Sequence, residues 1–343
     1  MKIIIVLVIA LMFAWAKLDP AYGREQLQTG SAGFPAAAAV QAPEAHSVDL
    51  ASIMNLLKEE MRPKIVSSAA ALPSRAIFGK DDRQELFSAP VQWKEIGHSL
   101  AGKVSLDHIT DHGSSWELHG DPLSAKECPG NRFADQITVP SCTGFLVKPD
   151  LLVTAAHCIK AQDDCDNFKW VFEYALAGQS DKNYTKVGTD RVYQCKKIVA
   201  RNYQNFGDID YAILQLDRPV EGRKPLKLAL NSQPTVGTEL VNIGNSNGLP
   251  LKYKDSAQIL HIKPTGQAFD SEMDTFGGDS GSPVFNAVTG EVLGITSSGH
   301  ADHFHDGTNS CRQLKVCKPG DKCNLAVASG IWNLKSEPAL GAN

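Results

Sequence analysis

From about Ala76 onward, short apolar runs alternate with turn-forming residues along the chain. Each run is bounded by Gly, Asn, Asp or Pro, a pattern typical of the strands of β-sandwiches and β-barrels. The clearest runs are Leu151–Thr154, Tyr211–Leu216, Leu240–Ile243, Ala257–Ile262, Val292–Thr296 and Ala326–Trp332. This part of the chain is therefore predicted to be all-β.

Three stretches depart from this pattern. Residues 24–45 are rich in Ala, Gly, Pro and Gln with little periodicity, which predicts a flexible segment. Val48–Leu57 places apolar residues at roughly helical spacing, and the pattern ends before Pro63. The polar stretch at about 105–137 predicts a long surface insertion within the β region.

The first residues of the chain form an apolar segment. Met1 and Lys2 are followed by Ile3–Ala16, an almost unbroken apolar run without charge. Such a run is short for a membrane span and right for a secretory signal, although an uncleaved anchor is the alternative. We predict a signal peptide over residues 1–23, secretion to an extracellular or periplasmic location, and no membrane association after its removal.

The amino-acid composition and net charge limit the partners and cofactors to be expected. The 343 residues are 43% hydrophobic and 21% charged, as in ordinary globular proteins, and the formal net charge is −4. This balance gives no reason to expect a nucleic-acid partner, and we expect a monomer. The eight cysteines are even in number, which predicts disulfides in an exported chain. No Cys-x-x-Cys pair occurs, so a structural zinc site is not expected. We also predict no cofactor.

A candidate catalytic constellation is spread over three motifs. His157 follows the apolar run Leu151–Thr154 and precedes Cys158, whose predicted disulfide partner is Cys142. Asp210 stands at the start of another apolar run, whereas its neighbours Asp208 and Asp217 lack that placement. Ser280 sits within the sequence Gly-Gly-Asp-Ser-Gly-Ser-Pro. These are the parts of a nucleophile, a general base and a carboxylate that orients the base.

The glycines around Ser280 fit the same chemistry. A serine hydroxyl is a weak nucleophile near neutral pH, so His157 would take its proton while Asp210 holds the imidazole. The backbone N–H groups of Gly278 and Ser280 would form the oxyanion hole, which is why no side chain is expected at position 278. Ser282 is predicted to be a strand residue rather than the nucleophile.

Taken in order, Ala-Ala-His157-Cys, Asp210-Tyr-Ala-Ile-Leu-Gln-Leu and Gly-Asp-Ser280-Gly-Ser-Pro resemble the motifs of chymotrypsin-family serine proteases. The sequences 77–83 and 275–286 resemble the secreted bacterial V8-like branch of glutamyl endopeptidases. The resemblance covers roughly Ala76 to Leu334. It implies two antiparallel six-stranded β-barrels, at 76–222 and 223–343, with the active site in the cleft between them, and protein or peptide substrates.

The resemblance also suggests substrate-binding residues. Ser297, Ser298 and Gly299 would pair with an extended substrate as an edge strand, and Gly299 would leave the pocket entrance open. Thr296 stands where V8-like enzymes carry a histidine that holds a substrate carboxylate. Asp274, followed by Thr275, has the spacing at which trypsin-like relatives place the carboxylate that selects Lys or Arg. A preference for Arg or Lys is predicted, with acidic or apolar and broad preferences as alternatives.

Activation by cleavage is a further expectation. The pattern of short β-like runs begins at about Ala76, directly after Pro73-Ser74-Arg75. Residues 24–75 are therefore predicted to be a pro-segment that is cut after Arg75. In much of the family the new N-terminus then pairs with the aspartate that precedes the nucleophile, here Asp279. The protein would accordingly be made as a zymogen.

Two other interpretations are retained. A relative that has lost catalysis and acts as a binding protein, adhesin or toxin is the alternative function, although all three triad positions are present. His300, His303 and His305, with Asp302 and Asp306, form a cluster that a metal could occupy, but a polar loop is expected there.

Overall fold

The computed structural model describes residues 77–128, 130–299, 311–314, 316–317 and 323–341, together with the backbone of residues 303–304. The predicted signal peptide, the predicted pro-segment and the predicted helix Val48–Leu57 lie outside the described residues. Strands predominate in the described part of the chain, whose α-helices are α3 (Val91–Gly97) and α4 (Asp164–Asn167). The all-β class predicted from the sequence is confirmed.

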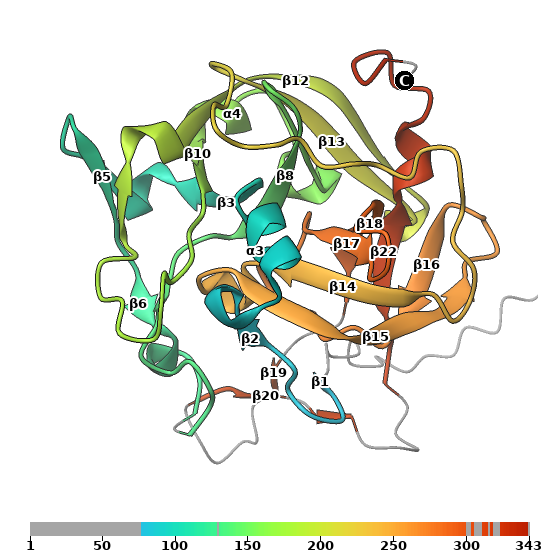
Figure 1. The fold of residues 1–343 in the computed structure, drawn as a ribbon, viewed down its shortest axis with the longest axis horizontal. Helices are drawn as coiled ribbons and strands as arrows, with labels where there is room; N and C mark the ends of the chain where they lie inside the picture. The colour runs from blue at the N-terminus through green and yellow to red at the C-terminus, as the bar shows by residue number, and fades with distance from the viewer. Residues whose placement is uncertain are drawn as a thin grey trace, which may run out of the picture. The chain divides into compact units, whose positions relative to one another are not determined.

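Six antiparallel strands close into a first barrel, in the order β10, β12, β13, β9, β8 and β3 (Figure 1). Along the chain they are β3 (Leu100–Ser105), β8 (Cys142–Lys148), β9 (Leu151–Thr154), β10 (Phe168–Phe172), β12 (Val192–Gln204) and β13 (Ile209–Leu216). Large apolar side chains such as Leu152, Trp170 and Leu214 fill its core, and each is 1% exposed or less. Burial of this apolar surface is the main source of the barrel's stability.

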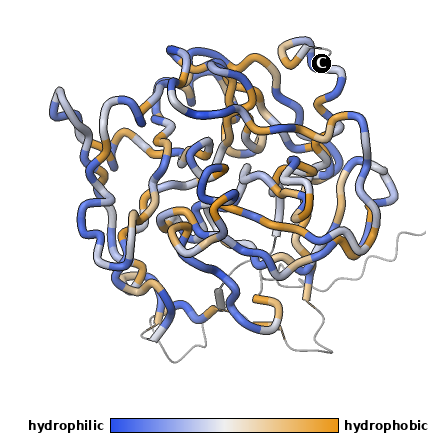
Figure 2. Tube along the Cα trace, in the orientation of Figure 1, coloured by the Kyte–Doolittle hydropathy of each residue, from blue (hydrophilic) through white to orange (hydrophobic). Residues whose placement is uncertain are grey.

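A second ring of six strands follows in the order β14, β17, β18, β22, β16 and β15, and the pairing of β14 with β15 closes it. Its members are β14 (Glu239–Gly244), β15 (Lys252–Ile262), β16 (Ala268–Ser271), β17 (Pro283–Asn286), β18 (Val292–Ser298) and β22 (Ala326–Gly330). Phe269, Phe285 and Ile295 are fully buried in its core. Hydrophobic stretches run along the strands of both barrels in Figure 2. The expected two-barrel fold is therefore present.

The remaining strands are short and form small sheets beside the barrels. They are β1 (Ile77–Phe78) with β21 (Val316–Cys317), β4 (Ile109–Asp111) with β5 (Ser115–Leu118) and β11 (Lys186–Gly188), β6 (Asp121–Pro122) with β7 (Ile137–Thr138), β19 (His303–Phe304) with β20 (Gln313–Leu314), and β2 (Gln84–Glu85) on β15.

The predicted surface insertion is more ordered than a polar loop. It contains β4 to β7, and its apolar residues Ile109 and Leu118 are buried against Val171 and Tyr174 in a separate core cluster. The sequence suggested a surface loop because polar residues outnumber these few buried positions.

The predicted boundary at 222/223 falls in the link between β13 and β14, but the N-terminal part of the predicted first barrel packs elsewhere. Strand β2 pairs with β15 of the second barrel. Trp93 of α3 lies 5.3 Å from Phe285, between ring centroids. The segment 84–97 therefore belongs with the second barrel.

All eight cysteines are paired, as Cys128–Cys311, Cys142–Cys158, Cys165–Cys195 and Cys317–Cys323. The second of these is the pair that the sequence predicts, and the other three were left open. Over the described residues, no helix is long and apolar enough to cross a bilayer.

Candidate active site

His157 is held by a short rigid segment of the first barrel. It lies in a 3₁₀ turn, Ala156–Cys158, directly after the fully buried strand β9. The disulfide from Cys158 to Cys142 ties this turn to β8. The backbone at His157 is therefore anchored on both sides, while the imidazole remains 35% exposed.

Asp210, the second residue of β13, is fully buried and accepts hydrogen bonds on both oxygens. Its Oδ2 accepts from Nδ1 of His157 at 2.6 Å and from the hydroxyl of Ser297 at 2.7 Å. Its Oδ1 accepts from the backbone N–H of His157 at 3.1 Å. Because Nδ1 donates to the carboxylate, Nε2 of the neutral ring is left as the proton acceptor.

The other carboxylates near Asp210 in sequence lie elsewhere. Asp208 accepts a hydrogen bond from the hydroxyl of Thr265, and Asp217 pairs with Arg218 at 3.0 Å. Of these three aspartates, Asp210 is the one that contacts His157, and its catalytic role stays a prediction.

The turn around Ser280 requires glycine at two positions. Gly278 and Gly281 have φ values of +94° and +82°. A Cβ at Gly278 would lie 2.2 Å from the carbonyl oxygen of Asn245, and one at Gly281 would lie 2.3 Å from that of Thr143. Both conformation and space therefore exclude larger residues.

The turn presents two unused backbone donors. Within the described part of the chain, neither Gly278 N–H nor Ser280 N–H donates a hydrogen bond to a protein acceptor, whereas those of Asp279, Gly281 and Ser282 do. Asn247 N–H donates to the carbonyl of Gly277, which fixes that peptide group. Because N–H and C=O of a trans peptide point in opposite directions, the Gly278 N–H faces away from Asn247. An oxyanion hole requires unused donors of this kind, and the assignment of Gly278 and Ser280 to one stays a prediction.

The turn is attached to the first barrel by Thr143 of β8, a residue that the sequence analysis did not single out. Its N–H donates to the carbonyl of Ser280 at 2.8 Å, and its hydroxyl donates to that of Gly278 at 2.8 Å. The same hydroxyl accepts the N–H of Asn245 at 3.0 Å. The position next to Cys142 was the available signal, but these three partners of Thr143 lie more than a hundred residues away in sequence.

Ser280 lies beside the turn that carries His157. The carbonyl of Ser280 lies 3.6 Å from Sγ of Cys158, the residue that follows His157. No hydrogen bond joins the hydroxyl of Ser280 to the imidazole in the described structure. Hydrogen bonds of this kind often shorten only when substrate binds.

Ser282 and Thr296 have interior positions. The hydroxyl of Ser282 donates to Thr296 Oγ1 at 2.9 Å, and Asn242 donates to both side chains. Ser282 and Thr296 are fully buried. Ser282 lies just before β17 and not within the strand, where the sequence analysis had predicted it. The roles predicted for Ser282 and for Thr296, as a residue that contacts substrate, stay predictions.

The predicted substrate edge is partly available. Strand β17 pairs with β18 only as far as Ile295, so Ser297 and Ser298 have no strand partner on that side within the described residues. The hydroxyl of Ser297 turns inward to Asp210, leaving its backbone for any added strand. Ser298 and Gly299 are half-buried.

Asp274 does not have the free carboxylate that the sequence prediction pictured. Its Oδ1 accepts Phe78 N–H at 2.8 Å, and its Oδ2 accepts Asp82 N–H at 3.3 Å. Burial and the neighbouring charge of Asp82 raise the pKa of Asp274 to about 8. Thr275 beside it is 3% exposed. The contacts of Asp274 join the segment Phe78–Asp82 to the turn, and its predicted role in selecting Lys or Arg remains a prediction.

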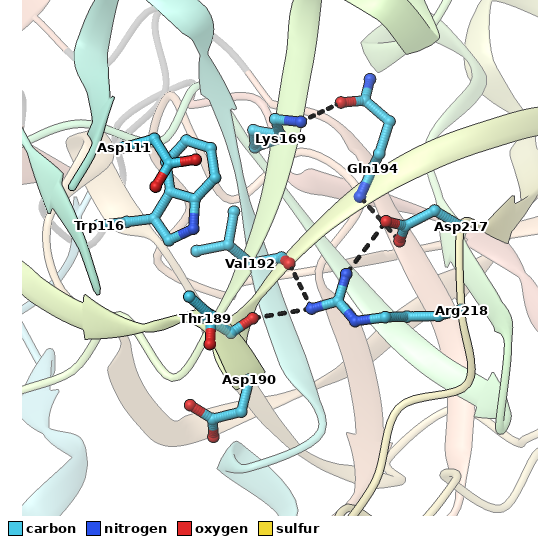
Figure 3. A pocket seen from close by; sticks show the side chains of 9 residues that line it. All are labelled: Asp111, Trp116, Lys169, Thr189, Asp190, Val192, Gln194, Asp217 and Arg218. Atoms are coloured by element: carbon cyan, nitrogen blue, oxygen red, sulfur yellow. Dashed lines mark hydrogen bonds and ion pairs between the residues drawn. The ribbon is translucent and has the colours of Figure 1, made fainter. Parts of the chain in front are cut away.

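Two hollows on the surface can be compared with this site. One of about 370 Å³ is lined by Gly277 and Gly278 together with residues of the insertion, so it adjoins the turn. Another, of about 430 Å³, lies outside the first barrel and is shown in Figure 3. Its lining residue Arg218 bonds to the carbonyls of Thr189 and Val192, and none of the predicted site residues reaches it.

Metal ligands were also considered. Cys142, His157 and Cys158 place ligand atoms within 4.8 Å of one another, but both sulfurs are committed to the disulfide. The histidine cluster at 300–305 lies outside the described side chains.

Comparison with known proteins agrees with this geometry. The family model of the trypsin-like peptidase domain matches residues 142–295. The thrombin-like enzyme acutin of Deinagkistrodon acutus is 28% identical over 209 residues, which are 54% of this chain and 80% of that protein. A glutamyl endopeptidase of Staphylococcus aureus is 26% identical over 182 residues, which are 50% of this chain and 51% of that protein. The chain thus spans about half the length of that endopeptidase.

Two solved protease structures align with the chain at TM-scores below 0.5. The VesB protease of Vibrio cholerae has a TM-score of 0.43 and 16% identity, over 69% of this chain and 62% of that chain. A Glu endopeptidase in complex with MPD has a TM-score of 0.42 and 14% identity, over 76% of this chain and 96% of that chain. The match to the trypsin-like peptidase domain spans the part of the chain that contains His157, Asp210 and Ser280.

Proposed function

We propose that this chain is a secreted serine endopeptidase in which Ser280 is the nucleophile, His157 the general base and Asp210 the residue that orients the base. The observation that carries the proposal is the 2.6 Å contact between His157 Nδ1 and the buried Asp210, which leaves Nε2 as the proton acceptor of the ring. The trypsin-like peptidase family supports protein or peptide substrates.

In the first half of the reaction, Ser280 Oγ attacks the carbonyl carbon of the scissile bond. His157 Nε2 takes the hydroxyl proton, and Asp210 stabilises the resulting imidazolium. The oxyanion accepts hydrogen bonds from the N–H groups of Gly278 and Ser280. His157 then gives its proton to the leaving amine, and an ester between Ser280 and the acyl half of the substrate remains.

In the second half, water takes the place of the amine. His157 removes a proton from the water, whose oxygen attacks the ester through the same oxyanion hole. Collapse of the intermediate returns the proton to Ser280 and releases the new carboxyl terminus. Electrostatic stabilisation of the oxyanion supplies a large part of the rate, because each donor contributes about 10²–10³-fold.

The substrate backbone would lie along Ser297, Ser298 and Gly299, whose β17 side has no strand partner in the described structure. Cleavage after Arg or Lys is the specificity that the sequence predicts through Asp274. The signal peptide, the pro-segment 24–75 and a monomeric secreted enzyme complete the proposal. Four disulfides are consistent with an oxidising compartment.

The proposal is tested by peptide hydrolysis with three variants. We expect Ser280→Ala and His157→Ala each to lower kcat by about 10⁶, because the two residues act as one unit. Ser282→Ala should retain kcat and lose only stability, since Ser282 bonds to Thr296 and Asn242 in the interior. Full activity of Ser280→Ala would exclude the mechanism.

The alternative is a binding protein without catalysis. It would require purified wild type, free of residues 1–75, to hydrolyse no member of a broad peptide library. That outcome, together with specific binding of a folded protein partner, would replace the proposal.

A further inference from the structure

The carboxylate that precedes Ser280 is paired inside the protein. Asp279 is fully buried and accepts from Lys254 Nζ at 2.7 Å, from the hydroxyl of Ser246 at 2.9 Å and from the N–H of Phe276 at 3.0 Å. The side chain of Lys254 is 1% exposed, and its ammonium also donates to Ser246 at 2.9 Å. Lysine, serine and aspartate thus form a closed buried triangle.

This triangle lies at the centre of the oxyanion turn. Asp279 is the residue between Gly278 and Ser280, whose N–H groups are the two unused donors. A buried carboxylate without a partner is strongly unfavourable, so its position follows that of the cation. If the carboxylate left this place, the peptide groups on either side of it would turn with it.

The same contacts bear on activation. The sequence predicts that an ammonium group freed at Ala76 would pair with Asp279. In the structure, Lys254 and Ser246 bind the Asp279 oxygens, and the first described residues, Ile77 and Phe78, pair with β21 instead. Ala76 itself lies outside the described residues.

We propose that Lys254 is the positioning residue of the oxyanion turn, and that the turn is ordered without an α-ammonium group at Ala76. This inference rests on the proposed function, because it assigns the cation that keeps the Gly278 and Ser280 donors in place. Lys254 touches neither substrate nor reacting atoms, and it acts through Asp279.

The chain offers a matched control in Lys252. This lysine lies two residues earlier on β15, is fully buried and pairs with Glu85 at 2.9 Å and Gln136 at 2.7 Å. The Lys252 side chain is as buried as that of Lys254, although its partner Glu85 is 16% exposed and Asp279 is fully buried, and Lys252 is not bonded to Asp279. A general loss of stability should therefore appear in both variants, and a loss of oxyanion stabilisation in only one.

The experiment compares Lys254→Met with Lys252→Met in the purified chain beginning at Ala76, at a temperature where both are folded by circular dichroism. We expect Lys254→Met to lower kcat by roughly 10²-fold with little change in KM, as for loss of an oxyanion donor. Lys252→Met should keep kcat within about twofold, and Lys254→Arg should recover part of the loss. Equal kcat values for the two methionine variants would overturn the inference.

If Lys254→Met does not fold, Ser246→Ala takes its place, because it removes one Asp279 contact at less cost. The expected fall in kcat is about tenfold, and an unchanged kcat would count against the inference.

A second arm compares chains that begin at Ala76 and at Ser74. Equal kcat values are expected, whereas inactivity of the longer form would show that a free Ala76 ammonium is needed. Peptide hydrolysis by the wild type separates the two proposals. An inactive wild type contradicts the proposed function. An active wild type, with equal kcat values for Lys254→Met and Lys252→Met, contradicts only the role of Lys254.

Discussion

At the residue scale, the candidate site depends on polar groups whose partners are far apart in sequence. His157, Asp210 and Ser280 could be found from the sequence because each sits in a contiguous motif with a recognisable flank. Thr143 and Lys254 could not, because a threonine on a strand or a lone lysine carries no local signal. Their roles arise only when β8 and β15 come beside the Ser280 turn.

Asp274 is the residue at which the structure changes the sequence picture most, and its pKa gives a test. Its carboxyl pKa is raised to about 8 by burial and by Asp82, and burial also raises the pKa of Asp82. Because the pKa of Asp274 in the folded state lies above its unfolded value of 3.8, the folded protein binds more protons than the unfolded chain at pH values between the two. The contribution of Asp274 to the free energy of unfolding should therefore be greatest below about pH 4 and should be lost as the pH rises through 8.

Asp274→Asn removes this linkage. We expect the variant to show a flatter dependence of unfolding free energy on pH, and to be more stable than wild type above about pH 8. Urea unfolding across this range is the measurement, and parallel curves for the two proteins would contradict the assignment.

Peptide-library profiling of the same variant tests specificity, because an unchanged preference for the residue before the cleaved bond rules out selection of Arg or Lys by Asp274.

At the element scale, each apolar run predicted as a strand contains one, although β22 ends at Gly330 and the last two residues of the run Ala326–Trp332 lie in a 3₁₀ turn. The long strand β12 (Val192–Gln204) was not predicted because most of it is exposed or half-buried and two register shifts interrupt its alternation. The small sheets in the insertion and the pairing of β1 with β21 were missed for a different reason. A two-residue strand is defined by its partner, and a sequence does not identify that partner.

The disulfide that anchors the His157 turn gives an element-scale prediction. Replacing both Cys142 and Cys158 by Ala opens a loop of 16 residues and should lower the free energy of unfolding by about 3 kcal/mol. We also expect a lower kcat, because the turn that carries His157 loses its attachment to β8. Urea unfolding and peptide hydrolysis measure the two effects.

The control is the pair Cys165 and Cys195, which links α4 to β12 away from the site. Its double alanine variant should lose comparable stability and keep kcat. An equal loss of kcat in both variants would mean that the Cys142–Cys158 bond has no specific effect on His157.

At the scale of the whole molecule, the candidate site exists only where the two barrels meet. Asp210 on the first barrel donates its N–H to the hydroxyl of Ser329 and accepts from Ser297, both on the second. In the other direction, Thr143 of the first barrel holds the Ser280 turn. The two-barrel fold was predictable from the pattern of short apolar runs and the family resemblance. The packing of segment 84–97 against the second barrel was not.

The central claim is that Ser280 is a nucleophile activated by His157, and covalent labelling tests it most directly. A fluorophosphonate probe is added to wild type, His157→Ala and Ser282→Ala, and the modified peptide is identified by mass spectrometry. We predict an adduct on Ser280 in wild type and in Ser282→Ala, and almost none in His157→Ala. An adduct on Ser282, or equal labelling of Ser280 without His157, would contradict the account.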